Sequence, residues 1–172
     1  SPILYNIGTI QDITLTVDVS GDSTTAGLVG ENRGDLSEIT INGSIKATQF
    51  VGGVVAMNEG NITHTVATTS ITGDSYTGGI AGVHDSGEIT TSYYNGDING
   101  QYKTGGITGA QIDGNISQTY STGTLSGNTD IGGIVGATDS PNLISNSYYD
   151  TNKQNKYGTQ LSTQELKTTR LQ

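Results

Sequence analysis

Three tyrosines form the first set of side chains whose type and spacing can do chemistry. Tyr93, Tyr120 and Tyr148 follow one another at steps of 27 and 28 residues. If the chain repeats with that period, their rings lie above one another on one outer face, and exposed aromatic ladders suit sugars or flat peptides. The alternative is that the rings only stack on each other and shield the strands beneath them. Tyr93, Tyr120 and Tyr148 are therefore candidate ligand-binding residues.

A second candidate binding site is the tripeptide Arg33, Gly34 and Asp35. It falls at a turn that we expect to be exposed, and Arg33 is one of only two arginines in the chain. An Arg-Gly-Asp turn of this kind suits binding to a host integrin. The competing interpretation is that Gly34 is simply the turn glycine of each repeat, and a short motif without structural context is weak evidence.

Histidines and acids do not form a recognisable catalytic or metal centre. His64 and His84 lack any metal-ligand spacing, so we expect ordinary surface or corner histidines. Asp18 and Asp97 share a repeat position but lie three repeats apart, ~14 Å by strand stacking, which is too far for a glycosidase carboxylate pair. Acidic turn residues such as Asp22 recur in too few repeats to build a calcium coordination sphere. We therefore expect no enzyme activity, no cofactor and no metal site.

A short repeat supplies the elements that must position the candidate residues. A Gly-Gly-aliphatic cluster begins at residues 26, 52, 78, 105 and 132, at steps of 26, 26, 27 and 27 residues. Units this short cannot bury a core alone and must stack on their neighbours. Two aliphatic columns keep the same period: Ile10, Leu36, Ile62, Ile89, Ile116 and Leu143, and also Val19, Ile45, Ile71, Ile98 and Leu125.

The segments within each unit predict strands, because they are β-branched and separated by turns rich in Gly, Asn and Asp. We predict an all-β chain that forms a parallel β-solenoid (β-helix) of about five to six coils of 26–27 residues. Ile13, Leu15 and Val17 alternate with polar residues and should face the core. This alternation changes phase just after Ile89 and Ile116, which marks a corner. The paired glycines allow positive φ or close backbone approach at a corner.

The chain divides into repeats over residues 1–150 and a tail over residues 151–172. The net charge of the first part is −12, from 15 acids and 3 bases, whereas the tail carries +3, from 1 acid and 4 bases. Ser162, Thr163, Gln164 and Glu165 form a capping-box pattern. We expect a short helix from about residue 163 to 170 that covers the open end of the last coil, since solenoid ends need caps.

Residues 87–100 (GEITTSYYNGDING) and 114–127 (GNISQTYSTGTLSG) resemble the GLUG-motif repeat, and residues 132–136 (GGIVG) are similar to its other half. The resemblance covers about residues 26–150, although Thr14 and Thr40 stand where the motif has Tyr. Such repeats occur in large secreted or surface-attached bacterial proteins, including adhesins, and in streptococcal IgA-cleaving metallopeptidases outside their catalytic region. The resemblance implies a β-solenoid in an extracellular position at the bacterial cell surface.

Composition narrows the function further. A net charge of −9 disfavours binding to nucleic acid or to anionic membranes, and no apolar run is long enough for membrane insertion. The chain has no Cys, so thiol chemistry is absent. We expect a non-catalytic adhesion or stalk module of a larger bacterial protein that binds a host glycan or extracellular-matrix protein. The alternatives are a filament or surface-layer subunit that self-associates through the solenoid ends, and an accessory repeat region of a secreted peptidase.

Overall fold

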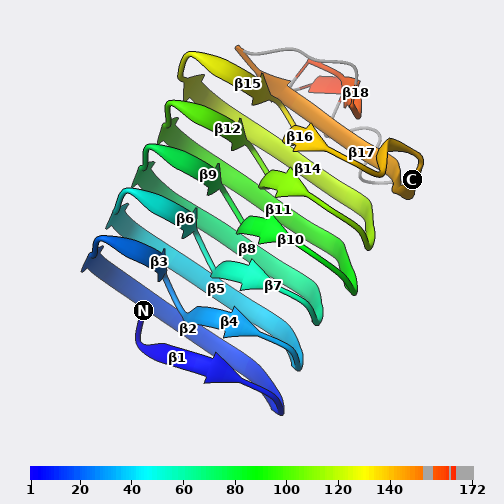
Figure 1. Cartoon of the computed structure of the whole chain (residues 1–172). Helices are drawn as coiled ribbons and strands as arrows, with labels where there is room; N and C mark the ends of the chain where they lie inside the picture. The colour runs from blue at the N-terminus through cyan, green and yellow to red at the C-terminus, as the bar shows by residue number, and fades with distance from the viewer. Residues whose placement is uncertain (153–156, 163, 166–172) are drawn as a thin grey trace.

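A computed structural model describes residues 1–152, 157–162, 164 and 165, which form a parallel β-solenoid (Figure 1). Each full coil contributes a four-residue strand, a twelve-residue strand and a second four-residue strand. The expected fold class, a parallel β-solenoid, is thus confirmed. Among the described residues, no helix is long and apolar enough to cross a membrane.

Equivalent strands of successive coils form three parallel sheets, which we name A, B and C. Sheet A contains β1 (Ile3–Asn6), β4 (Val29–Asn32), β7 (Val55–Asn58), β10 (Ala81–His84), β13 (Thr108–Gln111) and β16 (Val135–Thr138). Sheet B contains β2 (Thr9–Ser20), β5 (Asp35–Lys46), β8 (Asn61–Thr72), β11 (Glu88–Asn99), β14 (Asn115–Ser126), β17 (Ile144–Thr151) and β18 (Thr159–Gln160). Sheet C contains β3 (Ser23–Ala26), β6 (Gln49–Gly52), β9 (Ser75–Gly78), β12 (Tyr102–Gly105) and β15 (Thr129–Gly132).

Strand register confirms the repeat columns, with one exception. Ile116 pairs with Ile144, so the prediction that Leu143 continues this column is wrong. The reason is a 3-10 turn, Pro141–Leu143, which precedes β17 and adds one residue to the last coil. Tyr120 still pairs with Tyr148, as the step of 28 residues requires.

The long strands of sheet B bend at one non-glycine residue with positive φ. Thr91 has φ 50° and Gln118 has φ 50°, and equivalent residues in the other coils share this conformation. The bend changes which side chains point inward, so Ser92 follows it as a buried residue. The Ser92 hydroxyl donates to the Thr90 carbonyl at 2.9 Å and thereby satisfies a backbone group at the bend. The predicted change of phase after Ile89 and Ile116 is confirmed.

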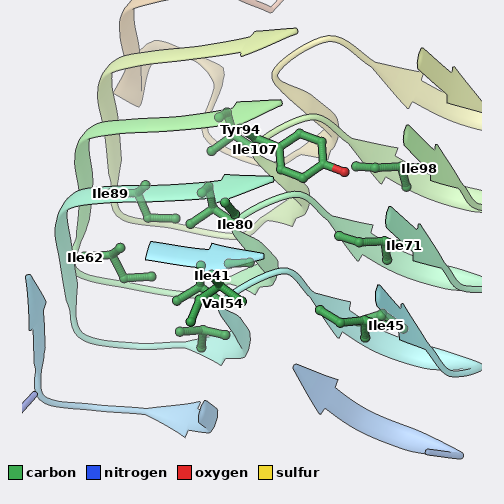
Figure 2. Close-up of a cluster of buried hydrophobic side chains, with 14 of the residues drawn as sticks. Ile41, Ile45, Val54, Ile62, Ile71, Ile80, Ile89, Tyr94, Ile98 and Ile107 are labelled. Carbon is green, nitrogen blue, oxygen red and sulfur yellow. The ribbon is translucent and has the colours of Figure 1, made fainter. Parts of the chain in front are cut away.

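Columns of aliphatic side chains fill the interior (Figure 2). One column places a large side chain beside a small one: Ile41, Ala67, Tyr94, Ser121 and Tyr149 are paired in turn along sheet B. Tyr94 is fully buried, and its hydroxyl donates to the Thr69 carbonyl. Burial raises the pKa of Tyr94 above the ordinary value for tyrosine, so the hydroxyl stays protonated and remains a donor.

The paired glycines are required by close backbone approach rather than by positive φ. A Cβ on Gly79 would lie 2.1 Å from the Gly106 carbonyl oxygen and 2.3 Å from the Tyr94 ring. A Cβ on Gly133 would lie 2.2 Å from the Tyr149 ring. Neither glycine adopts a left-handed conformation. This glycine column therefore lets successive coils stack over the two large buried tyrosines.

The tail adds a strand that the sequence did not predict. β18 pairs with β17, and the Leu161 amide donates to the Tyr149 carbonyl at 2.8 Å. The capping box is formed, because the Ser162 amide donates to Glu165 Oε2 at 2.8 Å and the Glu165 amide donates to Ser162 Oγ at 3.2 Å. Hydrogen bonds from the Ser162 amide and from the Ser162 side chain lower the pKa of the Glu165 carboxyl. Gln164 and Glu165 are helical, and the rest of the expected helix lies outside the described residues.

Substituting Gly79 by alanine should weaken the stack more than an equivalent change at Gly8. Gly79→Ala forces a methyl group against backbone and a buried ring, so we expect the free energy of unfolding to fall by about 2–4 kcal/mol. Gly8→Ala is the matched control, since nothing lies within 4 Å of its added Cβ, and should change stability by less than about 0.5 kcal/mol. Urea unfolding measures both, and equal effects would contradict the close-approach explanation.

Candidate binding groove

A groove of about 590 Å³ lies on the outer face of sheet B, where the long strands bend. It crosses β8, β11, β14 and β17 and therefore runs along the stacking direction. Its lining residues come from the bend and from the positions just after it: His64, Thr65, Val66, Thr91, Ser92, Tyr93, Gln118, Thr119, Tyr120, Asn146 and Tyr148. All three tyrosines that the sequence singled out lie in this one groove.

The tyrosines form a continuous aromatic surface in the groove. The rings of Tyr93 and Tyr120 stack with centroids 4.2 Å apart and planes at 28°. Strand register carries the column to Tyr148 and, in the other direction, to Val66. Each of these four side chains is half-buried, so part of its surface remains in contact with solvent.

Amide, imidazole and hydroxyl groups border the aromatic surface. His64, Thr91, Gln118 and Asn146 are the positive-φ residues of four successive coils and are exposed. Thr91 Oγ1 donates to Gln118 Oε1 at 3.1 Å, which fixes the amide so that its Nε2 group is the remaining donor of that side chain. The groove thus combines aromatic side chains with neutral hydrogen-bonding groups.

The groove does not extend over the first two coils. There the tyrosine column holds Thr14 and Thr40, and the bend positions hold Asp12 and Glu38, none of which lines the groove. None of the lining residues is Asp, Glu, Lys or Arg. The sequence pattern indicated the loss of tyrosine in these coils. One coil separates the last acidic bend residue from the first tyrosine, because His64 and Val66 stand between Glu38 and Tyr93.

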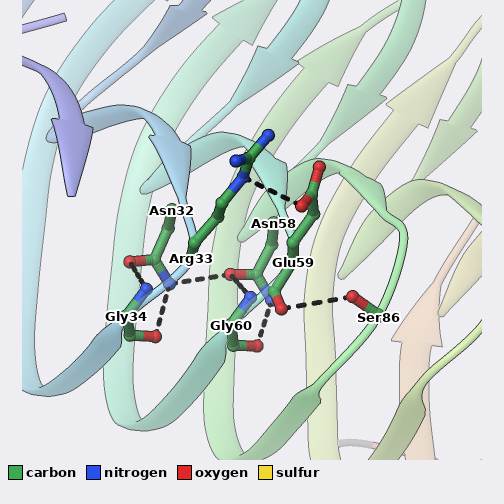
Figure 3. Close-up of polar contacts among 7 residues, drawn as sticks. All are labelled: Asn32, Arg33, Gly34, Asn58, Glu59, Gly60 and Ser86. Atoms are coloured by element: carbon green, nitrogen blue, oxygen red, sulfur yellow. Dashed lines mark hydrogen bonds and ion pairs between the residues drawn. The ribbon is translucent and has the colours of Figure 1, made fainter. Parts of the chain in front are cut away.

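The Arg-Gly-Asp turn lies elsewhere, between sheets A and B (Figure 3). Arg33 and Asp35 are exposed, as expected. Arg33 Nε lies 3.0 Å from Glu59 Oε2, and the Arg33 guanidinium lies 5.4 Å from the Tyr5 ring centroid. Asp35 Oδ1 accepts a 2.9 Å hydrogen bond from Asn61 Nδ2. Each charged side chain of the tripeptide is therefore already engaged by a neighbouring coil.

Beneath this turn runs a ladder of buried polar side chains. Asn6 Nδ2 donates to Asn32 Oδ1 at 2.8 Å, and Asn32 Nδ2 donates to Asn58 Oδ1 at 2.9 Å. Each asparagine also bonds the backbone of the residue two positions later, for example Asn32 Nδ2 to the Gly34 carbonyl at 3.1 Å (Figure 3). This ladder satisfies the turn of each coil and joins it to the next.

His84 occupies the next position of the asparagine ladder, at the end of β10 and beside a turn, so it is a corner histidine as expected but not a surface one. It is fully buried, with Nδ1 3.1 Å from Asn58 Nδ2 and Nε2 3.1 Å from the Asn115 carbonyl oxygen. The amide donor holds Nδ1 as an acceptor, which leaves the proton on Nε2. Burial lowers the pKa of His84 from 6.5 to about 4, against opposing hydrogen bonds to backbone carbonyls and nearby Asp85 and Asp113.

The remaining candidate residues stay apart. His64 is exposed, and within the described part of the chain no three His, Asp or Glu side chains gather as a metal site would require. Asp18 accepts a hydrogen bond from Ser44 Oγ at 3.0 Å in the neighbouring coil. Asp22 and Asp74 lie at equivalent turns with Thr48 between them, where successive backbones are bonded to each other.

No protein-family model matches the chain, and comparisons with curated proteins and with solved structures find no match either.

Burial of neutral His84 should make stability depend on pH. Its folded pKa lies below its unfolded value, so the unfolded chain takes up a proton first as the pH falls. Stability is unaffected by His84 above pH 6.5 and is lost between pH 6.5 and about 4, by up to about 3 kcal/mol. The measurement is urea unfolding across this range for the wild type and for His84→Asn, which continues the ladder. A wild-type loss that is no larger than that of His84→Asn would contradict the prediction.

Proposed function

We propose that this chain is a non-catalytic binding module of a larger extracellular protein at the bacterial cell surface, with adhesion or projection as its role. The proposal includes its placement among GLUG-motif repeats, on the segments quoted above. The observation that carries it is the groove over β8, β11, β14 and β17, in which tyrosine rings and neutral polar groups line one continuous surface. Such a lining offers contact area and hydrogen bonds to a host glycan or extracellular-matrix protein.

The geometry of the groove favours recognition over acid–base chemistry. Most glycoside hydrolases use two carboxyl groups that face the same bond as general acid and as base or nucleophile. The groove instead presents the stacked pair Tyr93 and Tyr120 beside Gln118, and its lining contains no carboxylate. The long strands that carry these side chains are paired on both sides, so the site is held on a rigid support.

Binding should be detected on an array of glycans and extracellular-matrix proteins and should depend on the tyrosine column. We expect the wild type to bind at least one probe and the double variant Tyr93→Ala/Tyr120→Ala to lose about tenfold or more in affinity, because it removes the stacked rings. Binding that persists in the double variant and disappears in Arg33→Ala would transfer the function to the Arg-Gly-Asp turn. Absence of binding to every probe would contradict the proposal.

A second candidate function is self-association through the first coil, whose apolar side chains are partly exposed among the described residues. Ile13, Leu15 and Val17 in β2 are only half-buried, whereas Ile39 and Ile41, the β5 partners of Ile13 and Leu15, are 0 % exposed. Near this end Leu4 is 80 % exposed and Ile7 75 % exposed in the described chain. An apolar coil with an open strand edge is a template for pairing with another solenoid end.

If this end pairs with a second copy, the particle size should rise with protein concentration in light scattering. Val17→Lys places a charge among the half-buried side chains of β2 and should hold the protein at one size, since edge lysines oppose strand pairing. Val17 lies on β2 and pairs with Gly43 on β5, neither of which lines the tyrosine groove. The variant should therefore keep the groove, and it supplies a control for the binding assay. A size that is independent of concentration in the wild type would exclude this candidate.

A further inference from the structure

We propose that the ligand of the tyrosine groove is an uncharged, linear oligosaccharide whose chain lies along the stacking axis of the solenoid. This inference rests on the proposed binding function and narrows it to one ligand class. Four features of the groove support this inference: its strands are paired on both sides, its tyrosine rings recur once per coil, its lining residues are uncharged, and it spans four strands.

The backbone of the groove has no edge that a peptide could extend. β8 is paired with β5 and β11, β11 with β8 and β14, and β14 with β11 and β17. A bound peptide gains much of its affinity in β-augmentation from unpaired strand groups, which these inner strands do not offer. Recognition must therefore use side chains alone, and these side chains are rings, hydroxyls and amides.

Sugar rings present a flat, largely apolar face and a rim of hydroxyl groups. The rings of Tyr93, Tyr120 and Tyr148 recur once per coil along the groove. Because Tyr93 and Tyr120 stack face to face with centroids 4.2 Å apart, it is the ring edges that remain for a ligand to contact. Gln118 and Asn146 recur at the same interval on the border of the groove, because both are bend residues of their coils. A chain of linked sugar rings can thus pack against the edges of successive tyrosine rings and place its hydroxyl groups near the amides.

The uncharged lining of the groove and the negative net charge of the chain both disfavour binding of acidic polysaccharides. The bend positions next to the tyrosines hold only neutral or imidazole side chains, whereas the acidic bend residues Asp12 and Glu38 lie outside the groove. The chain as a whole carries a net charge of −9, which repels sulfated or carboxylated glycans. A groove without Lys or Arg has no group with which to hold their anionic substituents.

The length of the groove favours an oligomer over a single sugar. Four strands span three stacking steps, about 14 Å at ~4.8 Å per step. A monosaccharide would contact one tyrosine at a time, whereas a short linear chain would cover Tyr93, Tyr120 and Tyr148 together. Affinity should therefore rise with chain length until the three rings are covered.

The test is titration of the whole chain with defined saccharides by isothermal calorimetry and tyrosine fluorescence, which is free of tryptophan signal because the chain has no Trp. The uncharged probes are linear hexasaccharides of glucose, mannose and N-acetylglucosamine, each beside its monosaccharide. The anionic probes are heparin and hyaluronan. We expect at least one uncharged hexasaccharide to bind, more tightly than its monosaccharide and equally well at low and high salt.

Single-residue variants test whether the saccharide binds at the tyrosine column. Tyr120→Ala should weaken hexasaccharide binding about tenfold or more, and Tyr120→Phe, which keeps the ring, should stay within about threefold of the wild type. Tyr102→Ala is the matched control, because Tyr102 is 52 % exposed on β12 of sheet C and should leave affinity unchanged. Unfolding curves show whether each variant keeps the stack.

The outcomes separate the ligand class from the binding function. Tighter, salt-sensitive binding of heparin or hyaluronan would overturn the inference of an uncharged ligand. Binding of a matrix protein that depends on Tyr93 and Tyr120, with no oligosaccharide bound, would overturn the saccharide and leave the proposed function standing. Failure of every saccharide and every protein probe would overturn both.

Discussion

The close approach of successive coils at one glycine column is the constraint on which the rest of this structure depends. At Gly79 the backbone of the next coil and the Tyr94 ring leave no room for even a methyl group. The same crowding recurs at Gly106 and Gly133, beneath Ser121 and Tyr149. Because the backbones meet here at a fixed separation, every other position in a coil is brought over its equivalent in the next. The neighbours of a side chain in this fold are therefore the equivalent residues of the coils on either side. A residue type that recurs at one position forms a ladder along the stack.

Two ladders show how differently the same stacking can be used. The asparagine ladder is buried and fully engaged, so it joins the turns of successive coils and is a structural device. When His84 replaces asparagine it keeps the bond to Asn58 but directs its other ring nitrogen to the Asn115 carbonyl. It also introduces a group that can titrate into an otherwise neutral column. The tyrosine ladder lies on the outer face, and its rings are half-buried at a bend. It leaves ring area and neutral polar groups in contact with solvent, as a surface for recognition requires.

Much of the fold could be predicted from the sequence, because equivalent residue types of a solenoid recur along the chain at intervals of one coil. The spacing of Ile62, Ile89 and Ile116 gave the stack and its register, and alternation gave the outward position of Tyr93 and Tyr120. The residue pattern could not predict how side chains of different size pack inside the stack, or where a local turn shifts the register. The burial of Tyr94 depends on the small neighbours Ala67 and Ser121 on adjacent coils, and the shift from Leu143 to Ile144 depends on a local 3-10 turn. The site was predicted in part: its tyrosines were identified, whereas the groove needed a bend angle that no residue spacing specifies.

The position of the groove also bears on how such a site can change over generations. Each coil contacts only the coils beside it, so a repeat can be gained or lost without altering the rest of the stack. Each of β11, β14 and β17 brings one tyrosine and one bend residue to the groove as a unit. Duplication of a single coil would thus lengthen the groove by one ring and one polar group in the same event. The number of coils then sets how much of a polymeric ligand the groove can contact. Recombination between repeats can change this length by one coil at a time, without accumulated point substitutions.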